Sequence, residues 1–331
     1  MTETQRLDLA LVDRGLVRSR TAARTAIEQG RVSVDGRAVV KVSHPVRADA
    51  RLEVDGDDRY VSRAALKLAA ALDAANLDVE GLLALDLGAS TGGFTQVLLE
   101  RGARRVIALD VGHGQLDPAL RADPRVVVVE GENARALTAE RLAEVSGVVV
   151  SSSAESGTAT GEGAASAPET VGLVVADLSF ISLTLVLPAI VATVGTEVPI
   201  VLLIKPQFEA GRKGIREGIV RDAIVRDDAI MTVLWAASDL GLHASELLSS
   251  PIVGSAGNHE YLAVFRPGVG RHPTEWRGRA TALASALPGS PDAEPGTAER
   301  GTAESSTAER RTAQSSTAEP SPTDSSQEDP S

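Results

Sequence analysis

Seven short runs of apolar residues recur between residues 60 and 267 of the chain. The first five are separated by helix-like stretches and several are apolar on both faces, which is typical of parallel strands covered by helices. The last two are separated by only ten residues rich in Ser, Pro and Gly, which favours a closing hairpin. We therefore predict an α/β fold with a Rossmann-like, seven-stranded sheet. The predicted strands are LLALDL (82–87), RVIALDV (105–111), RVVVVE (125–130), GLVVADL (172–178), PIVLLIKP (199–206), HASELL (243–248) and HEYLAVF (259–265).

A different pattern in residues 5–56 predicts a small α+β unit at the N-terminus. RLDLALVDRG indicates one short helix, and a second helix is expected to begin after Ser19 as its N-cap and to end at Gly30. RVSVDGRAVV alternates apolar and polar residues around Asp35-Gly36, which is a hairpin signal. ADARLEVDG, at residues 48–56, predicts a further strand.

Two stretches have too few large apolar side chains to offset the entropy of an ordered chain. One is SSSAESGTATGEGAASAPE, and the other is a tail with five imperfect copies of a pentamer, beginning at GTAER. We therefore predict a small domain, a linker, a large domain with a disordered insertion, and a disordered tail. Their expected bounds are 1–58, 59–64, 65–268 with the insertion at 151–170, and 269–331.

Composition narrows the class of protein. With 43% hydrophobic residues the chain can form a core, and with no cysteine it cannot have disulfides, thiolate metal sites or cysteine nucleophiles. The five histidines show no metal-ligand spacing. No window approaches the ~18 uncharged apolar residues of a membrane-spanning helix, and MTETQRLDLALVDRG lacks the apolar region of a signal peptide. We expect a cytoplasmic protein with no metal and no membrane partner.

The charge of the chain is unevenly distributed. A net charge of −12 is unfavourable for binding to nucleic acid. Between Arg6 and Arg47, however, there are nine basic residues and only four acidic ones. Local clustering attracts a phosphate backbone more than net charge does, and arginine matches phosphate with two hydrogen bonds. An ordinary solvated helix face is the alternative. The arginines expected to contact nucleic acid are Arg6, Arg14, Arg18, Arg20 and Arg24.

A glycine-rich loop follows the first predicted strand of the large domain and opens a helix. Its spacing is GxxxGG, with Ser90 where a dinucleotide-binding loop has glycine, so a nucleoside ligand is favoured over a pyrophosphate. Asp110 ends the second strand, where an acid can accept hydrogen bonds from both ribose hydroxyls. S-adenosylmethionine fits because it has a ribose and no phosphates. The predicted cofactor residues are Asp86, Gly88, Ser90, Gly92, Gly93 and Asp110.

Charged residues also stand at the ends of other predicted elements. Asp177 and Lys205 each end an apolar run, Glu260 stands at the start of the last strand, and Lys67 lies in the helix before the first strand. Charges in such positions are partly desolvated, which is costly unless they are paired or functional. Any one of these residues could instead belong to an ordinary ion pair at the edge of the sheet. The presence of all four favours a functional cluster.

Residues 5–267 resemble the TlyA family, which is often labelled hemolysin A but is similar to ribosomal RNA 2′-O-ribose methyltransferases. The resemblance rests on RYVSRAALKLAAAL, LDLGASTGGFTQVLLERGA, VVADLSFISL, IKPQFEAGR and GNHEYLAVF, among other stretches. The N-terminal unit is similar to the RNA-binding domain first named in a small-subunit ribosomal protein. The remainder is similar to the FtsJ-like catalytic domain.

This resemblance implies specific roles. The family's Lys-Asp-Lys-Glu tetrad falls on Lys67, Asp177, Lys205 and Glu260, and its cofactor motifs fall on the loop residues above and on Asn133. It implies methyl transfer from S-adenosylmethionine to cytidine ribose in 16S rRNA, 23S rRNA or both, within ribosomal subunits. We expect Lys205 to be the general base, which requires its neutral form; a charged Lys205 that stabilises a developing alkoxide is the alternative.

Four other functions are weighed against this one. A membrane-active hemolysin would need a spanning segment or a basic amphipathic helix, and neither is visible in the sequence. A non-catalytic rRNA-binding protein would not need the complete tetrad. A pseudouridine synthase, which shares the N-terminal domain type, would not need the glycine loop with Asp110. A small-molecule methyltransferase would leave the basic N-terminal unit without a purpose.

Overall fold

The computed structural model describes residues 4–17, 19–28, 30–54, 59–148, 169–211, 218–254 and 257–286. Arg18, nearly all of the predicted insertion and the pentamer repeats therefore lie outside the described residues. The last two residues of the predicted insertion are described, and Glu169 forms ion pairs of 2.7 Å with Arg104 and Arg105.

The N-terminal unit has its own core, formed by Leu7, Leu11, Ile27 and Val32 among others. Its elements are β1 (Thr4–Arg6), α1 (Leu7–Asp13), α2 (Arg20–Glu28), β2 (Val32–Val34), β3 (Arg37–Ala38), β4 (Pro45–Arg47) and β5 (Leu52–Val54). Both helices and the hairpin were predicted. Ser19 caps α2 by accepting the Ala22 backbone N–H, and Asp35 and Gly36 both have positive φ, as a tight hairpin turn requires. The pairing of β1 with β4 was not predicted.

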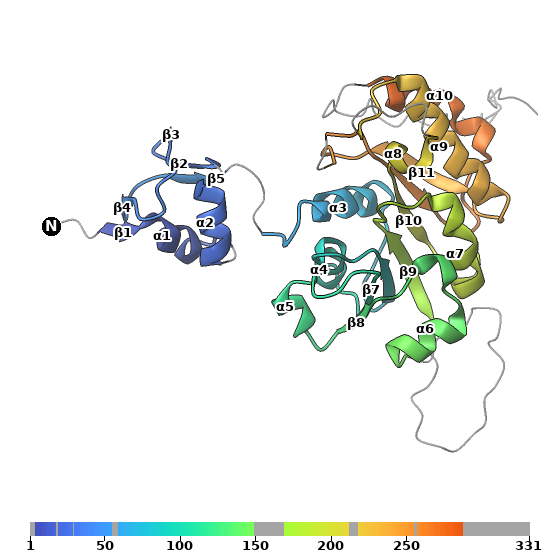
Figure 1. Ribbon diagram of the computed structural model, residues 1–331, viewed down its shortest axis with the longest axis horizontal. Coiled ribbons are helices and arrows are strands. Elements are labelled where there is room, and N and C mark those ends of the chain that lie inside the picture. Colours follow the sequence, from blue (N-terminus) through green and yellow to red (C-terminus); the bar gives the residue numbers. More distant parts are fainter. Residues whose placement is uncertain are drawn as a thin grey trace, which may run out of the picture. The chain divides into compact units, whose positions relative to one another are not determined.

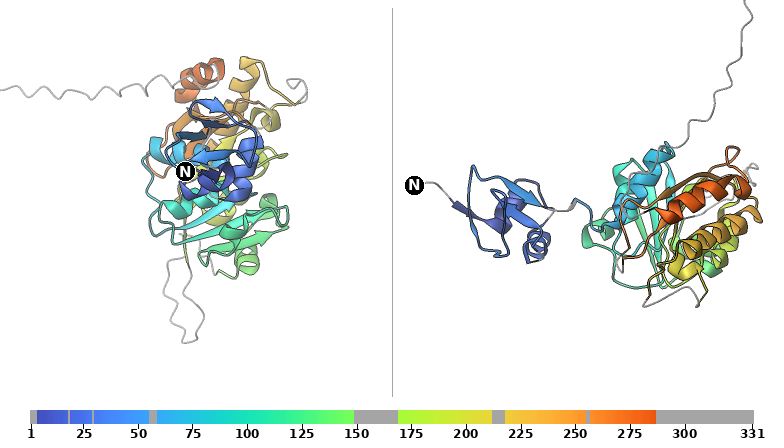
Figure 2. Two further views of the ribbon diagram at one scale, coloured as in Figure 1. Left: turned by 90° about the vertical axis from the view of Figure 1, so that its left-hand side faces the viewer. Right: turned by 90° about the horizontal axis from the view of Figure 1, so that it is seen from above.

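The large unit is built on a seven-stranded sheet of order β11-β12-β10-β9-β6-β7-β8 (Figures 1 and 2). The five strands from β10 to β8 in this order are parallel, and β12 runs antiparallel to both β10 and β11. The predicted sheet and its antiparallel closing hairpin are confirmed. The strands are β6 (Leu83–Leu87), β7 (Arg105–Asp110), β8 (Val126–Glu130), β9 (Val171–Ala176), β10 (Ile200–Ile204), β11 (Ala244–Ser249) and β12 (Tyr261–Phe265).

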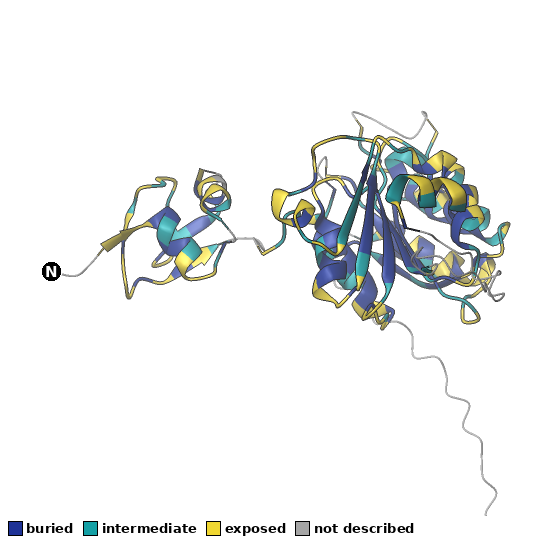
Figure 3. Cartoon of the chain, turned by 90° about the horizontal axis from the view of Figure 1, so that it is seen from below, coloured by how far each residue is buried: buried dark blue, intermediate teal, exposed yellow. Residues whose placement is uncertain are grey.

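Helices cover both faces of this sheet. Along β6, Leu83, Leu85 and Leu87 pack with the helices of one face, whereas Ala84 packs with those of the other. Apart from the edge strand β8, the strands are accordingly buried along most of their length (Figure 3). One face is covered by α6 (Ala139–Ser146), α7 (Leu187–Val194), α9 (Ala223–Ser238) and α10 (Pro273–Ser285), and the other by α3 (Ala64–Ala74), α4 (Gly93–Glu100) and α5 (Pro118–Arg121). Shorter turns are η1 (Ala134–Ala136), η2 (Leu183–Leu185) and α8 (Pro206–Glu209).

The predicted tail begins too early. Residues 273–285, placed in a disordered tail by the sequence analysis, form α10. The helix starts with a capping box between His272 and Glu275, and its Trp276 and Leu283 are buried in the core. The prediction was wrong because the composition of the tail concealed a helical spacing of apolar residues within its first seventeen or so positions.

Candidate functional site

The glycine-rich loop lies at the carboxyl end of β6, against the carboxyl end of β9. Gly88 has φ +83°, and a Cβ atom there would lie 2.7 Å from the carbonyl oxygen of Asp177, so only glycine fits. Asp110 ties this loop to the end of β7. Its two carboxylate oxygens accept the backbone N–H groups of Ser90, at 2.8 Å, and Gly112, at 2.7 Å.

A cavity of about 570 Å³ opens at this edge of the sheet. Four of the predicted cofactor residues line it: Gly88, Ser90, Asp110 and Asn133. Its volume is within the ~300–1,000 Å³ typical of small-molecule sites. Asp177, a predicted tetrad residue, also lines it. The rest of the lining was not predicted and consists of Leu109, Val111, Gly112, Gln115, Glu132, Ala134, Leu178, Ser179, Phe180, Ile181 and Val186.

The other predicted cofactor residues lie outside this lining and pack the loop in place. A Cβ atom on Gly92 would lie 2.3 Å from the Leu120 side chain, and one on Gly93 would lie 3.1 Å from the Ala65 backbone nitrogen. Asp86 is completely buried, and the Thr95 hydroxyl donates to it at 2.6 Å. Burial, opposed by the Thr95 hydrogen bond, raises the pKa of Asp86 to about 7.

The four tetrad residues form two ion pairs, of which Lys67–Glu260 is buried and Lys205–Asp177 is partly buried. Lys205, directly after β10, has its Nζ atom 2.6 Å from Oδ1 of Asp177, and it donates to the Ser179 hydroxyl at 2.8 Å. Lys67, on α3, donates to Oε2 of Glu260 at 2.5 Å. A Cβ atom on Gly254 would lie 2.4 Å from Oε1 of Glu260, so a glycine there leaves room for this carboxylate.

Sheet register brings the two pairs to one edge. Ile204 is paired with Tyr261, so Lys205 and Glu260 each lie one residue beyond the last pair of the β10–β12 ladder. The backbone N–H of Asp177 donates to the carbonyl of Leu87, immediately before Gly88. Asp177 also lines the cavity. The predicted convergence of the charged strand ends with the glycine loop is therefore present in the fold.

Two residues that were not predicted as site residues, Ser179 and Phe180, line the cavity at this edge. Ser179 is a hydrogen-bond partner of Lys205, and Phe180 has a positive φ of 64° and is 91% exposed. Both lie in the loop after β9. In parallel sheets ligands bind at such loops, so their position after a strand ending in Asp177 was the available signal.

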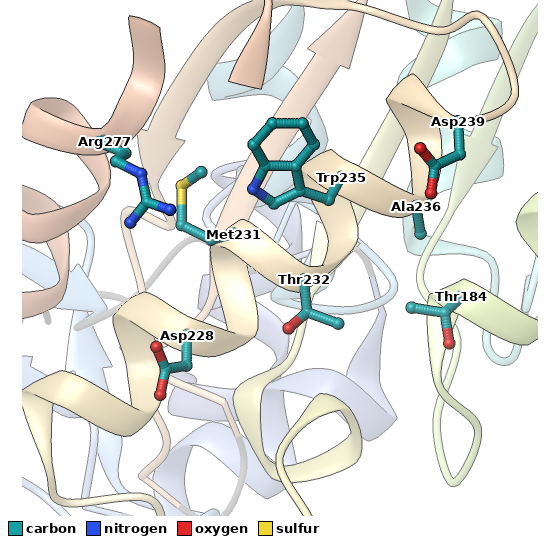
Figure 4. Close-up of a pocket in the computed structure, with 8 residues that line it drawn as sticks. All are labelled: Thr184, Asp228, Met231, Thr232, Trp235, Ala236, Asp239 and Arg277. Atoms are coloured by element: carbon teal, nitrogen blue, oxygen red, sulfur yellow. The ribbon is translucent and has the colours of Figure 1, made fainter. Parts of the chain in front are cut away.

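A second cavity, of about 590 Å³, lies along α9 (Figure 4). Met231 and Trp235 project into it from successive turns, and Arg277 of α10 faces Met231 across it. Its other lining residues are Thr184, Asp228, Thr232, Ala236 and Asp239. It contains no predicted site residue, so the cavity beside Asp110 is the candidate cofactor site.

In the N-terminal unit the predicted RNA-contacting arginines differ in their partners. Arg6 and Arg20 both bind the buried carboxylate of Asp8, at 2.9 and 3.1 Å, while their own side chains stay half or more exposed. The hydrogen bond from Arg6 is the main cause that lowers the pKa of Asp8. Arg24 pairs with Glu28 on the surface of α2. Arg14 donates to backbone carbonyls of the turn at residues 47–50, which is a structural role.

Within the described part of the chain, no helix has the length and apolarity needed to cross a membrane. The same residues contain no group of three or more His, Asp or Glu side chains arranged to hold a metal ion.

Comparison with known proteins identifies both units. Residues 60–266 match the FtsJ-like methyltransferase family, and residues 5–52 match the S4 domain. The chain is 43% identical over 269 residues to the 16S/23S rRNA (cytidine-2′-O)-methyltransferase TlyA of Mycobacterium tuberculosis, covering 80% of this chain and 91% of that protein. It is 38% identical to Hemolysin A of Brachyspira hyodysenteriae, covering 78% of this chain and 99% of that protein.

A solved structure is similar over most of the chain. The “putative hemolysin” from Streptococcus thermophilus superposes with a TM-score of 0.60 and 33% identity, covering 86% of this chain and 95% of that one. The chain therefore belongs to the FtsJ-like methyltransferase family, as a homologue of TlyA that carries an N-terminal S4 domain.

Proposed function

We propose that this protein uses S-adenosylmethionine to methylate the ribose 2′-hydroxyl of cytidine in 16S rRNA, 23S rRNA or both, as part of ribosomal subunits. The observation that carries the proposal is the position of two ion pairs, the partly buried Lys205–Asp177 and the buried Lys67–Glu260, at the sheet edge that borders the cavity. The name of the Mycobacterium tuberculosis relative supports the choice of substrate.

The residues that line the cavity suit S-adenosylmethionine. Asp110 would accept hydrogen bonds from the ribose hydroxyls, because each of its oxygens has used one lone pair on a backbone N–H and retains another. Gly88 and Ser90 would form the floor beside it, with Asn133 on the opposite loop. When bound, the cofactor supplies a methyl group on a sulfonium, which is already an activated donor.

Lys205 would take the proton of the 2′-hydroxyl. A neutral amine has two N–H groups and one lone pair. Ser179 accepts one N–H in the structure, and Asp177, whose Oδ1 lies 2.6 Å from the Lys205 nitrogen without a hydrogen bond, would accept the other. The lone pair would then be directed away from both acceptors and available to the substrate. A ribose hydroxyl is a weak nucleophile until its proton is removed, so this fixed geometry would assist attack on the methyl carbon.

The Lys67–Glu260 pair would bind the substrate beside this base. Lys67 has one N–H committed to Glu260 and retains two that could donate to a phosphate or to the attacking oxygen. Glu260 would hold the lysine side chain in position, since both groups are almost fully buried.

Recognition of rRNA would involve both units. Arg6 and Arg20 are held by one carboxylate and expose their guanidinium groups, which suits contacts to RNA phosphates. Arg18 and Arg24 stay predicted contacts of the same kind. Phe180, exposed at the cavity, offers a face on which an unstacked base could stack.

Mapping of ribose methylation in rRNA tests this function. Ribosomal subunits from cells that lack the gene would be incubated with the purified protein and S-adenosylmethionine. We expect new 2′-O-methylcytidine at defined positions. Modification of a base, or no transfer to either subunit, would contradict the proposal.

A further inference from the structure

The segment from Asp177 to Leu183 is here called the wall segment, because its first five residues, 177–181, line one side of the cavity. It carries Asp177 and Ser179, the two partners of Lys205. It also contains Phe180 in a left-handed conformation, with φ 64°. For a bulky non-glycine residue this conformation is strained, and it persists only where the surroundings hold it. Contacts from neighbouring residues must therefore hold the wall segment in this conformation.

The residues that follow Lys205 provide that restraint. In α8, the Phe208 ring lies 5.3 Å from the Phe180 ring, centroid to centroid. Glu209 then accepts two hydrogen bonds from the far end of the wall segment: the Ser182 hydroxyl donates to Oε2 at 2.5 Å, and the Leu183 backbone N–H donates to Oε1 at 2.9 Å. The chain from Lys205 to Glu209 thus contacts the wall segment at both ends and in the middle.

The Glu209 carboxylate is partly buried, so its charged form is disfavoured in a way that a surface carboxylate is not. Burial raises its pKa, while the hydrogen bonds from Leu183 and Ser182 lower it. No cation is paired with it among the described residues. A half-buried carboxylate without a cationic partner is unfavourable unless its hydrogen bonds serve a purpose.

We propose that Glu209 is a positioning residue, which clamps the wall segment to the chain that carries Lys205 and so keeps Asp177 and Ser179 in contact with the Lys205 amine. This inference rests on the proposed function, because the geometry it preserves is that of the proposed base. Glu209 itself does not touch the substrate.

Two substitutions of Glu209 distinguish the effect of its hydrogen bonds to the wall segment from the effect of its negative charge. In Glu209→Gln the amide oxygen can still accept the Leu183 N–H. The amide NH₂ can donate to the Ser182 hydroxyl, which lies 2.7 Å from Thr184 Oγ1 and can turn its own proton there. Glu209→Ala removes both contacts. We expect kcat for methyl transfer to fall about 10- to 100-fold in Glu209→Ala and to stay within about threefold of wild type in Glu209→Gln, with little change in KM for rRNA.

Amide hydrogen exchange gives a readout that does not depend on activity. In Glu209→Ala, exchange in residues 178–184 should become at least about tenfold faster, while exchange in β11 stays unchanged. Glu275→Ala is the matched control, since Glu275 also accepts a backbone N–H, from His272 at 3.1 Å, but does so at the start of α10. It should leave kcat and the exchange of residues 178–184 at wild-type values.

Unchanged kcat and unchanged exchange in Glu209→Ala would overturn the inference, as would equal losses in the alanine and glutamine variants. If wild-type protein transfers no methyl group, the proposed function fails, and the hydrogen-exchange comparison still tests the clamp by itself.

Discussion

At the scale of single residues, Asp86 is a position of the cofactor motif that lies in the interior and does not line the cavity. Its side chain is fully buried, Thr95 donates to one oxygen, and the other oxygen has no hydrogen-bond partner among the described residues. Burial raises its pKa from 3.8 to about 7. Between those values the folded protein retains a proton that the unfolded chain has lost, so stability falls as the pH rises through this interval.

Asp86→Asn should remove this part of the pH dependence. Asparagine still accepts the Thr95 hydroxyl but does not ionise. From pH 5 to pH 8 the ionisation of Asp86 should lower the free energy of unfolding of the wild type by about 3 kcal/mol, and that loss should be absent from the variant. Urea unfolding of both proteins at the two pH values measures the difference. Equal pH dependence in both would mean that Asp86 is already ionised in the fold at pH 5.

Residue spacing predicted which side chains gather at the sheet edge but not how they pair. Lys67 and Glu260 are separated by 193 positions in the sequence, and their contact depends on α3 packing against the start of β12. Nothing in the local sequence around either residue specifies that partner. The roles of Gly92 and Gly93 were likewise hidden, because the helix that packs against each glycine is visible only in the fold.

At the scale of elements, the strands were predictable because burial on both faces makes them continuous apolar runs. The strand β1 was not, since its three residues are all exposed and it pairs with β4 across some forty positions. The helix α10 was missed because low-complexity composition follows it directly. Its place in the core is fixed by Trp276 and by Arg226, whose guanidinium donates to the carbonyl of Ala284.

Two truncations should distinguish α10 from the pentamer repeats. A chain ending after residue 268 loses α10, uncovers the core around α9 and leaves the buried Arg226 without its Ala284 acceptor. We expect its Tm to fall by 10 °C or more, on the order of the effect of several lost core side chains. A chain ending after residue 286 should unfold within about 2 °C of the full chain. Thermal unfolding followed by circular dichroism decides this, and equal Tm values for the two truncations would show that α10 contributes no stability.

At the scale of the whole molecule, the chain combines an S4 domain with an FtsJ-like methyltransferase domain. The net charge of −12 does not describe the S4 unit, because residues 6–47 contain nine basic residues and only four acidic ones. This division predicts that binding to ribosomal RNA and binding of the cofactor can be weakened separately.

The double substitution Arg6→Ala and Arg20→Ala tests that separation. Each would remove one positive charge from the proposed RNA-binding surface, so affinity for ribosomal subunits should fall and the slope of log Kd against log salt should decrease by about two. Affinity for S-adenosylmethionine should not change. Arg125→Ala is the control, because Arg125 is also an arginine paired with an aspartate, Asp123, but lies in the methyltransferase domain. An unaltered salt slope in the double variant would exclude these two arginines from RNA binding.

The most direct test of the site compares cofactor binding with methyl transfer in Lys205→Ala and Lys205→Arg. Calorimetric titration would measure S-adenosylmethionine affinity, and a radiolabelled methyl donor would measure turnover on ribosomal subunits. Lys205 lies outside the cavity lining, so both variants should bind the cofactor within a few-fold of wild type. Turnover should fall by at least about a hundredfold in both, because arginine keeps the charge but cannot accept a proton at neutral pH. Retention of wild-type turnover by Lys205→Ala, with cofactor bound, would contradict the account.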